Sequence, residues 1–189
     1  GDEYCWIIDP LDGTANFVRG IPHFAISIAV KKEGELLVGM IYDPIRNELF
    51  TAARGSGAQL NSRRMRVSTT THLQQAMVGT GFPFRDKHLV EPYLNTFADV
   101  FPHTSDIRRA GSAALDLAYV ACGRLDGFWE ASLKEWDMAA GVLMIQEAGG
   151  MLCDFNGEAD YLSNGSIIAG NPRVFKQLSQ RIMNTLHKD

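Results

Sequence analysis

Apolar and polar residues alternate in short runs along the first 82 residues, which predicts strands. The clearest run is residues 24–31, where alternate positions differ in size. The larger set is Phe24, Ile26, Ile28 and Val30, and the smaller set is Ala25, Ser27 and Ala29. A period of two is that of a strand, and small residues opposite large ones suggest a sheet packed closely on both faces. Further strands are predicted at residues 4–9, 36–42, 48–53 and 77–82, with turns at residues 33–34 and 44–47.

The spacing of apolar residues changes to three and four in the rest of the chain, which predicts helices. In residues 88–101 the shared face consists of Val90, Tyr93, Leu94, Phe97 and Phe101. In residues 111–123 it consists of Ala114, Leu117, Ala118 and Ala121, with Ser112 placed to cap the start.

Two more helices and three short strands complete the pattern. Residues 136–150 predict a buried helix that begins with Asp137 as its N-cap and ends at the glycine pair 149–150. The last helix covers residues 171–188, with Asn171 as cap, Pro172 in the first turn, and an inward face of Phe175, Leu178, Ile182 and Leu186. Strands are expected at residues 125–130, 151–155 and 166–170. Strands and helices in blocks indicate layered sheets and helices.

Composition narrows the functional classes. The chain has 189 residues, which fits one domain spanning residues 1–189 or one domain plus a fragment of another. Its content of 46% hydrophobic and 21% charged residues is ordinary for a globular protein. The net charge of −4 gives no case for general nucleic-acid binding, and no apolar run reaches the roughly 20 residues of a membrane span. Cys5, Cys122 and Cys153 are scattered, without the spacing of a metal site, which fits a reducing cytosol.

Two carboxylates three positions apart, Asp9 and Asp12, follow the first predicted strand. Pro10 keeps Asp9 extended at the strand end, and Gly13 permits a turn into a helix that starts near Thr14. This arrangement brings together carboxylates, which bind Mg²⁺, and free backbone N–H groups, which bind phosphate oxygens. Alternatively, Asp12 only caps a helix and Asp9 is a turn residue.

A second aspartate, Asp137, is predicted at another helix start after Trp136. An aspartate at an N-cap is most often structural. Two aspartate-bearing helix starts in one chain suggest a shared site for a metal-bound phosphate. Glu130, at the end of a predicted strand, taken alone is an edge residue.

These segments resemble the inositol monophosphatase family of Mg²⁺-dependent, lithium-sensitive phosphatases. Residues 6–30, WIIDPLDGTANFVRGIPHFAISIAV, and 136–150, WDMAAGVLMIQEAGG, are similar to its two signatures. The resemblance covers essentially the whole chain. Residues 42–61 and 111–130 look most like the bacterial SuhB-type branch. Ala15 departs from the threonine that the family usually has at that position.

The resemblance implies roles for individual residues. Asp9, Asp12, Asp137 and the backbone carbonyl of Leu11 match metal ligands. Gly13 and Thr14 match phosphate-binding positions, and the threonine also orients the attacking water. The residues that match contacts to the inositol ring are Ser112, Ala113 and Glu130, and Asp137 is implied as a further substrate-binding residue. Asp9, Asp12, Thr14 and Asp137 would then be the catalytic set.

The implied function is Mg²⁺-dependent hydrolysis of inositol monophosphate, or of a similar polyol or sugar phosphate, by a homodimer in the cytosol. Alternative substrates are fructose 1,6-bisphosphate, adenosine bisphosphate or NADP. SuhB-type relatives also imply a non-catalytic role in transcription antitermination and ribosomal RNA maturation.

The implied fold is an α+β, layered α-β-α-β-α sandwich whose outer N-terminal part is absent from this sequence. In the family that part carries a Glu-Glu motif, one residue of which binds the first metal and helps activate the water. We therefore expect exposed apolar surface on the first sheet and a first metal site that lacks one ligand within residues 1–189.

Overall fold

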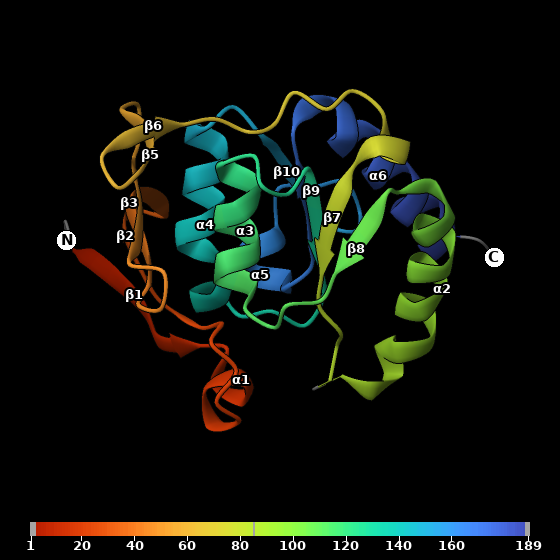
Figure 1. The fold of residues 1–189 in the computed structure, drawn as a ribbon, viewed down its shortest axis with the longest axis horizontal. Helices are drawn as coiled ribbons and strands as arrows, with labels where there is room; N and C mark the ends of the chain where they lie inside the picture. Colours follow the sequence, from red (N-terminus) through yellow and green to blue (C-terminus); the bar gives the residue numbers. More distant parts are fainter. Residues whose placement is uncertain (1–2, 85, 188–189) are drawn as a thin grey trace.

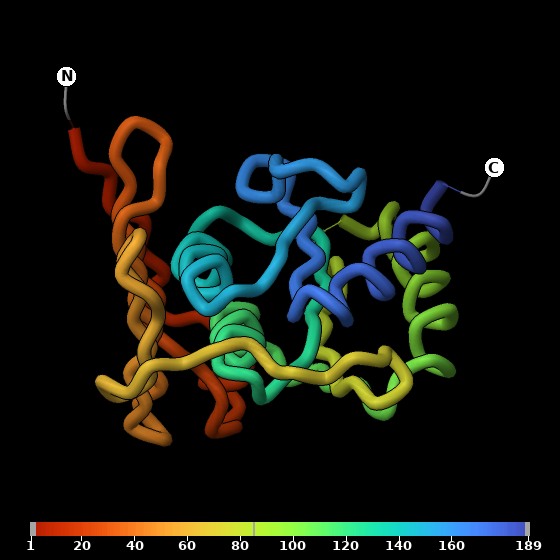
Figure 2. Tube along the Cα trace, turned by 90° about the horizontal axis from the view of Figure 1, so that it is seen from above, coloured from red at the N-terminus to blue at the C-terminus, as the bar shows by residue number. Residues whose placement is uncertain are grey.

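Two β-sheets and two layers of helices alternate in the computed structural model, which describes residues 3–84 and 86–187. Figures 1 and 2 show these layers in two perpendicular views: a sheet, a pair of helices, a second sheet and an outer pair of helices. The α+β class is confirmed, and the order β-α-β-α matches the last four layers of the expected sandwich.

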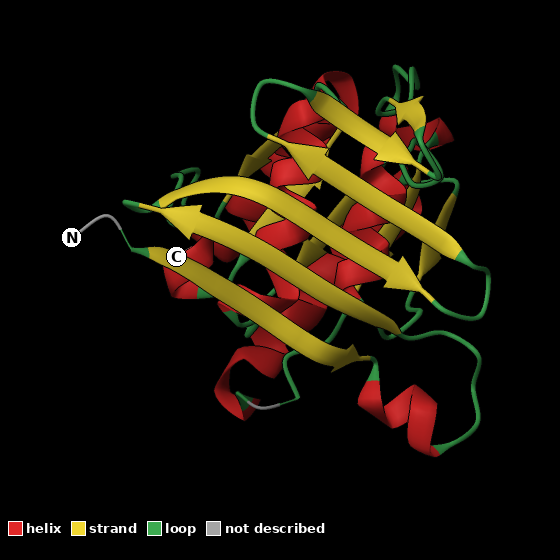
Figure 3. Cartoon of the chain, turned by 90° about the vertical axis from the view of Figure 1, so that its left-hand side faces the viewer, coloured by secondary structure: helices red, strands yellow, loops and turns green. Residues whose placement is uncertain are grey.

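The first sheet is an antiparallel meander of six strands in sequence order (Figure 3). Its strands are β1 (Tyr4–Asp12), β2 (Ala25–Lys32), β3 (Glu35–Asp43), β4 (Glu48–Ala53), β5 (Gly57–Leu60) and β6 (Arg63–Met65). The first four were expected, although β1 continues to Asp12 instead of ending at Asp9. The last two lack a run of alternating apolar residues long enough to identify them.

The two faces of this sheet differ, so the expectation of close packing on both faces is wrong. Ala25 and Ala29 are buried, whereas Trp6 and Tyr4 on β1 are 65% and 60% exposed. Small residues let a helix approach closely: a Cβ on Gly39 would lie 3.0 Å from the Cα of Ala140. The expectation of exposed apolar surface on the first sheet is confirmed.

Helices α3 (Ala113–Ala121) and α4 (Glu135–Glu147) form the inner layer between the two sheets. They contact each other and both sheets, and most of their residues are buried. Ser112 caps α3 as expected, because its side-chain oxygen accepts a hydrogen bond from the Leu115 N–H. The N-cap of α4 is Lys134, so the placement of Asp137 as N-cap is wrong. Asp137 instead occupies the third helical position.

The second sheet is mixed, in the order β10-β11-β9-β7-β8. Its strands are β7 (Met77–Thr80), β8 (Asp106–Arg108), β9 (Gly127–Glu130), β10 (Met151–Cys153) and β11 (Ile167–Gly170). Strand β7 is parallel to β8 and β9, whereas β11 is antiparallel to its neighbours. The three-residue β8 was not predicted.

The outer layer consists of α2 (Val90–Val100) and α6 (Pro172–Leu186), which pack on each other, with α6 also on the second sheet. The buried residues of α2 are Tyr93, Thr96 and Val100, whereas Val90, Leu94 and Phe101 of the predicted face are exposed. The predicted face was therefore right for Tyr93 and Phe97, which pack in the core, and wrong for the other three residues. Short segments complete the chain: α1 (Thr14–Val18), α5 (Tyr161–Asn164), η1 (Leu73–Gln75), η2 (Lys87–Leu89) and η3 (Phe101–His103). Within the described residues, no helix is long and apolar enough to cross a membrane.

The cap of α6 supports a test of stability. Asn171 is 2% exposed, and its oxygen accepts hydrogen bonds from the N–H groups of Arg173 and Val174. Its amide nitrogen donates to Ser68 Oγ and the Thr70 carbonyl.

Asn171→Ala should lower the free energy of unfolding by about 2 kcal/mol, because it removes a cap and leaves buried partners unpaired. Urea denaturation would measure this loss. The exposed Asn184→Ala is the control, and equal effects of the two variants would contradict the prediction.

Candidate functional site

A bulge at the end of β1 places the two aspartates of the first signature. Asp9 pairs with Ser27 and Asp12 with Ala25, so β1 carries one more residue than β2 over this stretch. The N–H of Leu11 donates to Asp9 Oδ1 at 3.0 Å, which holds the bulge. The expected turn follows at once.

That turn begins at Gly13, which has a positive φ of 85° and is the N-cap of α1. A side chain there would be strained, and its Cβ would lie 3.0 Å from the His23 carbonyl oxygen. Thr14 Oγ1 donates to the Leu11 carbonyl at 2.9 Å. A carbonyl oxygen has a second lone pair, so Leu11 can still accept another partner.

Asp12 is fixed to the start of α3, one hundred residues away in sequence. Its Oδ2 accepts hydrogen bonds from Ser112 Oγ at 2.6 Å and from the Ala114 N–H at 2.8 Å. The Ser112 hydroxyl therefore makes two hydrogen bonds: it donates to Asp12, and it accepts from the Leu115 N–H as the cap of α3. The contact joins the first sheet to the inner helical layer at the site.

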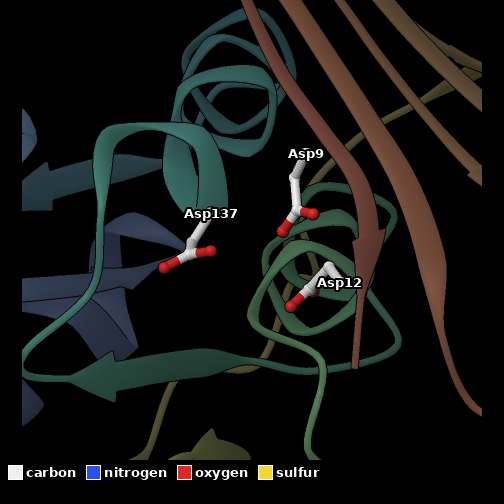
Figure 4. A group of neighbouring side chains, drawn as sticks. All are labelled: Asp9, Asp12 and Asp137. Carbon is white, nitrogen blue, oxygen red and sulfur yellow. The ribbon is translucent and has the colours of Figure 1, made fainter. Parts of the chain in front are cut away.

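Asp137 completes a group of three carboxylates. It is 9% exposed, and its Oδ2 accepts a hydrogen bond from the Lys134 N–H at 2.8 Å. One carboxylate oxygen from each of Asp9, Asp12 and Asp137 lies within 4.8 Å of the others. Figure 4 shows the three side chains converging from β1 and α4. Oxygens gathered in this way are the donor set of a hard divalent cation.

The raised pKa of Asp12 is consistent with a cation-binding role for the three carboxylates. Burial raises its pKa to about 6, against the hydrogen bonds from Ser112 and Ala114, and the charges of Asp137 and Asp9 add to the increase. Carboxylates held together without a cation repel each other, and a bound cation reverses this effect. The three residues thus fit a metal ion.

A pocket adjoins the carboxylates and contains the expected ring-contacting residues. Asp12, Ser112, Ala113, Glu130 and Asp137 all line it. Burial raises the pKa of Glu130 well above its ordinary value, and the charges of Asp116 and Asp12 add to this. The structure therefore brings the residues of the second half of the chain to the aspartates of the first.

Several pocket residues were not expected. Asp116 and Gly81 line the pocket, as do Phe82 and Phe84. Asp116 had one visible signal in the sequence, since it is the only charged residue in the otherwise apolar run AALDLAYVA. The role of Gly81 depends on what lies opposite it, which the sequence does not show.

The arginine pair 108–109 separates into two environments, one exposed and one in the pocket. Arg108 forms an exposed ion pair with Asp106 at 2.6 Å. Arg109 lines the pocket, with its guanidinium 5.1 Å from the ring centre of Phe84 and 5.7 Å from that of Phe82. It brings positive charge to a pocket with several carboxyl groups.

Comparison with known proteins identifies the family. Residues 1–188 match the inositol monophosphatase family over practically the whole chain. The chain belongs to the inositol monophosphatase family. The aspartates that converge at the site come from the two segments in which the sequence resembles the signatures of this family.

Individual family members are similar over most of the chain. The Nus factor SuhB of Pseudomonas aeruginosa is 56% identical over 180 residues, 94% of this chain and 66% of that protein. The structure of the extragenic suppressor protein suhB from Bartonella henselae is 49% identical, with a TM-score of 0.92, and the match covers 95% of this chain and 69% of that one. The inositol monophosphatase from Anabaena is 41% identical, with a TM-score of 0.91, over 96% and 75%.

These matches confirm the resemblance to the SuhB-type branch and the fold of the family. The chain spans about two thirds of the length of the curated relatives it matches. The names of those relatives point in two directions, to a phosphatase family and to a Nus factor.

Proposed function

We propose that the chain hydrolyses inositol monophosphate, or a similar polyol or sugar phosphate, in a Mg²⁺-dependent reaction with water. The products are the free alcohol and inorganic phosphate. The observation that carries the proposal is the convergence of Asp9, Asp12 and Asp137 to within 4.8 Å beside a pocket. Nearness of three carboxylates is unfavourable without a cation and favourable with one.

In this proposal the metal ligands are Asp9, Asp12, Asp137 and the carbonyl of Leu11. Magnesium, when bound, would act as a Lewis acid that offsets the charge of the phosphate and favours loss of a proton from water. Thr14 donates to the Leu11 carbonyl, and its hydroxyl oxygen could also accept a hydrogen bond that orients the water.

The remaining residues bind the two halves of the ester. The backbone N–H groups of Gly13 and Thr14, at the start of α1, suit phosphate oxygens. On the alcohol side, Ser112, Ala113 and Glu130 line the pocket. Catalysis then depends on holding the ester between β1 and the starts of α3 and α4.

The test is phosphate release from inositol 1-phosphate with Mg²⁺ and with a chelator. We expect turnover that needs the metal. The same assay with fructose 1,6-bisphosphate, adenosine bisphosphate and NADP separates the alternatives. Turnover of one of these without turnover of inositol 1-phosphate would contradict the proposed substrate. No metal-dependent turnover, in residues 1–189 or in a chain extended upstream to the length of the relatives, would contradict the proposed reaction.

Metal binding should depend on pH through Asp12. A proton competes with the cation for this carboxylate, whose pKa is raised to about 6. Affinity for Mg²⁺ should therefore be constant at higher pH and fall roughly tenfold per pH unit below about 6. Calorimetric titration between pH 7.5 and 5 measures this. Asp12→Asn should show no measurable Mg²⁺ binding at any pH of the range, and unchanged affinity across the range in the unsubstituted chain would contradict the prediction.

A second candidate function is a non-catalytic part in transcription antitermination and ribosomal RNA maturation, with RNA polymerase machinery as a partner. The specific support is the 56% identity to a relative named Nus factor SuhB. Complementation of a strain that lacks the endogenous protein decides between the functions. If Asp12→Asn restores the cellular role as well as the unsubstituted chain does, binding is the function that matters there. Loss of rescue, with the variant folded and abundant, favours catalysis.

Two further features of the proposal come from the family. We expect a homodimer, which light scattering would test, and a monomer would contradict that expectation. We also place the reaction in the cytosol, which accords with three cysteines that are all free thiols.

A further inference from the structure

Positive charge is concentrated on β6, the last strand of the first sheet (Figure 1). Arg63, Arg64 and Arg66 are all exposed. Within the described residues, the guanidinium groups of Arg63 and Arg64 form no ion pair or hydrogen bond, and that of Arg66 donates to the Glu147 carbonyl oxygen at 3.1 Å. None of the three is therefore paired with a carboxylate, in a chain whose net charge is −4.

These arginines line a groove between the β5–β6 hairpin and the C-terminal end of α3. The other residues that line it are Glu48, Leu60, Asn61, Met65 and Cys122. Glu48 is the one carboxylate among these lining residues, and its two oxygens accept hydrogen bonds from Arg124 at 2.5 and 2.6 Å. The charge of Glu48 is thus balanced by Arg124, and the groove remains positive. Guanidinium groups bind the paired oxygens of carboxylates and phosphates, so the groove fits an anionic ligand.

The backbone of β6 is open to a partner, because β5 is its one neighbour in the sheet. The two strands are joined by a turn at Asn61 and Ser62, both of which have a positive φ. The residues that flank such a turn, Leu60 and Arg63, form a hydrogen-bonded pair. Bonded and non-bonded pairs alternate along an antiparallel ladder. The N–H and C=O of Arg64, in the next pair, therefore point away from β5 toward the free edge.

The arginine side chains are arranged to suit an extended peptide at this edge. Side chains along a strand alternate between the two faces of the sheet, so Arg63 shares the face of the buried Met65 and Arg64 lies on the other. A peptide paired with β6 alternates in the same way, so its successive acidic side chains would reach both arginines.

RNA fits the groove less well than an acidic peptide does. The lining residues include no aromatic side chain on which a base could stack. A long polyanion would also extend beyond the groove over a chain with a net negative charge. The free N–H and C=O groups of an edge strand match those of another extended peptide.

We propose that the groove at β6 binds an acidic segment of a partner protein, which pairs with β6 as an added strand. Arg63 and Arg64 bind carboxylates of this segment, and the backbone of Arg64 forms hydrogen bonds with its backbone. The inference does not depend on the proposed hydrolysis, because the groove shares no lining residue with the pocket beside Asp12.

The experiment measures the binding of short labelled peptides by fluorescence anisotropy at low ionic strength. The first peptide has a central run of glutamates flanked by valines. The second has glutamines in place of the glutamates, and the third is the first with an N-methylated backbone. We expect the first peptide to bind, with a Kd that rises in added salt. The other two should bind at least about tenfold more weakly, because one lacks the charges and the other cannot pair as a strand.

Substitutions in the protein locate the binding site. Arg63→Gln combined with Arg64→Gln should raise the Kd of the first peptide about tenfold, through the loss of two charge pairs. Arg173→Gln combined with Lys176→Gln is the matched control, because it removes the same charge from exposed positions on α6. The control should leave the Kd unchanged. Thermal melts of each variant exclude unfolding as the cause.

Several results would overturn the inference. Equal losses in the two double variants would show that the net charge of the chain, and not the groove, attracts the peptide. Undiminished binding of the N-methylated peptide would exclude strand pairing. Tighter binding of a single-stranded RNA than of the acidic peptide, lost in the β6 variant, would make RNA the ligand. If the β6 variant binds the peptide normally but self-associates in light scattering, the arginines only keep the edge of the sheet from pairing with other copies.

Discussion

Asp12→Asn should lower kcat/KM for inositol 1-phosphate about a thousandfold, equivalent to roughly 4 kcal/mol of transition-state stabilisation. Asparagine has the shape of aspartate, and its oxygen can still accept the hydrogen bonds from Ser112 Oγ and the Ala114 N–H. What is lost is one negative charge beside Asp9 and Asp137. The substitution therefore removes a cation ligand with little change in packing.

The same substitution should stabilise the metal-free protein. Burial raises the pKa of Asp12 from 3.8 to about 6, so between these values the unfolded chain loses its proton first. The metal-free fold thus loses stability as pH rises through that window, by up to about 3 kcal/mol, and the loss persists above it. Asparagine does not ionise, so Asp12→Asn should escape this loss.

Thermal melts in chelator at pH 4 and pH 7.5, together with kinetics in Mg²⁺, measure both effects. The expected pattern is lower activity with higher metal-free stability at pH 7.5, and no stabilisation by added Mg²⁺. The exposed Asp106→Asn should change neither quantity. A variant that keeps most of its activity, or that melts lower than the unsubstituted chain in chelator, would contradict the assignment of Asp12.

Much of this architecture could be predicted from local patterns. Alternation in residues 24–31 predicted β2, and Asn171 with Pro172 located the start of α6, since both signals act over only a few residues. The segment from Asp9 to Thr14 likewise contains its own turn chemistry. Resemblance to the family then predicted that Asp137 lies beside this segment, although more than a hundred residues separate them. The periodicity of apolar residues carries no information about such distant contacts.

The predictions that were wrong depend on tertiary packing. Helix α2 buries Thr96, whose Oγ1 accepts a hydrogen bond from Trp129 Nε1, whereas the apolar Leu94 remains exposed. A polar side chain can be buried when it has a hydrogen-bond partner in the core. The hydrophobicity of each residue therefore does not by itself predict which side chains of a helix are buried. Asp116 and Gly81 were missed for a related reason, because each is defined by a group from another element.

Gly141→Val should destabilise the fold by about 3 kcal/mol, at the upper end of the usual cost of overpacking a core. A Cβ at Gly141 would lie 2.5 Å from the Cβ of Leu117, where α4 meets α3. Leu117 Cβ is attached directly to its backbone, so rotation of the side chain does not remove the clash. Helix α4 also has no room to retreat, because Ala140 lies against Gly39 of the first sheet.

The site should be affected along with the stability. Asp137 lies one helical turn before Gly141, and Asp12 is held by hydrogen bonds to the start of α3. Forcing the two helices apart therefore separates carboxylates that must share a cation. We expect weaker Mg²⁺ binding in Gly141→Val under conditions where the variant is still folded.

Urea denaturation and Mg²⁺ titration of a graded series measure both effects. In an open helix Gly→Ala stabilises by about 1 kcal/mol through helix propensity. Gly141→Ala should destabilise instead, and Gly141→Val should do so more strongly. Gln146→Val, an exposed position on the same helix, is the control for placing a β-branched residue in α4. It also removes a hydrogen bond from Gln146 Nε2 to Tyr161 Oη, and it should cost about 1 kcal/mol, less than Gly141→Val. Stabilisation by Gly141→Ala would show that α3 and α4 can separate freely, and the close approach of the helices would then not be what positions Asp137 beside Asp12.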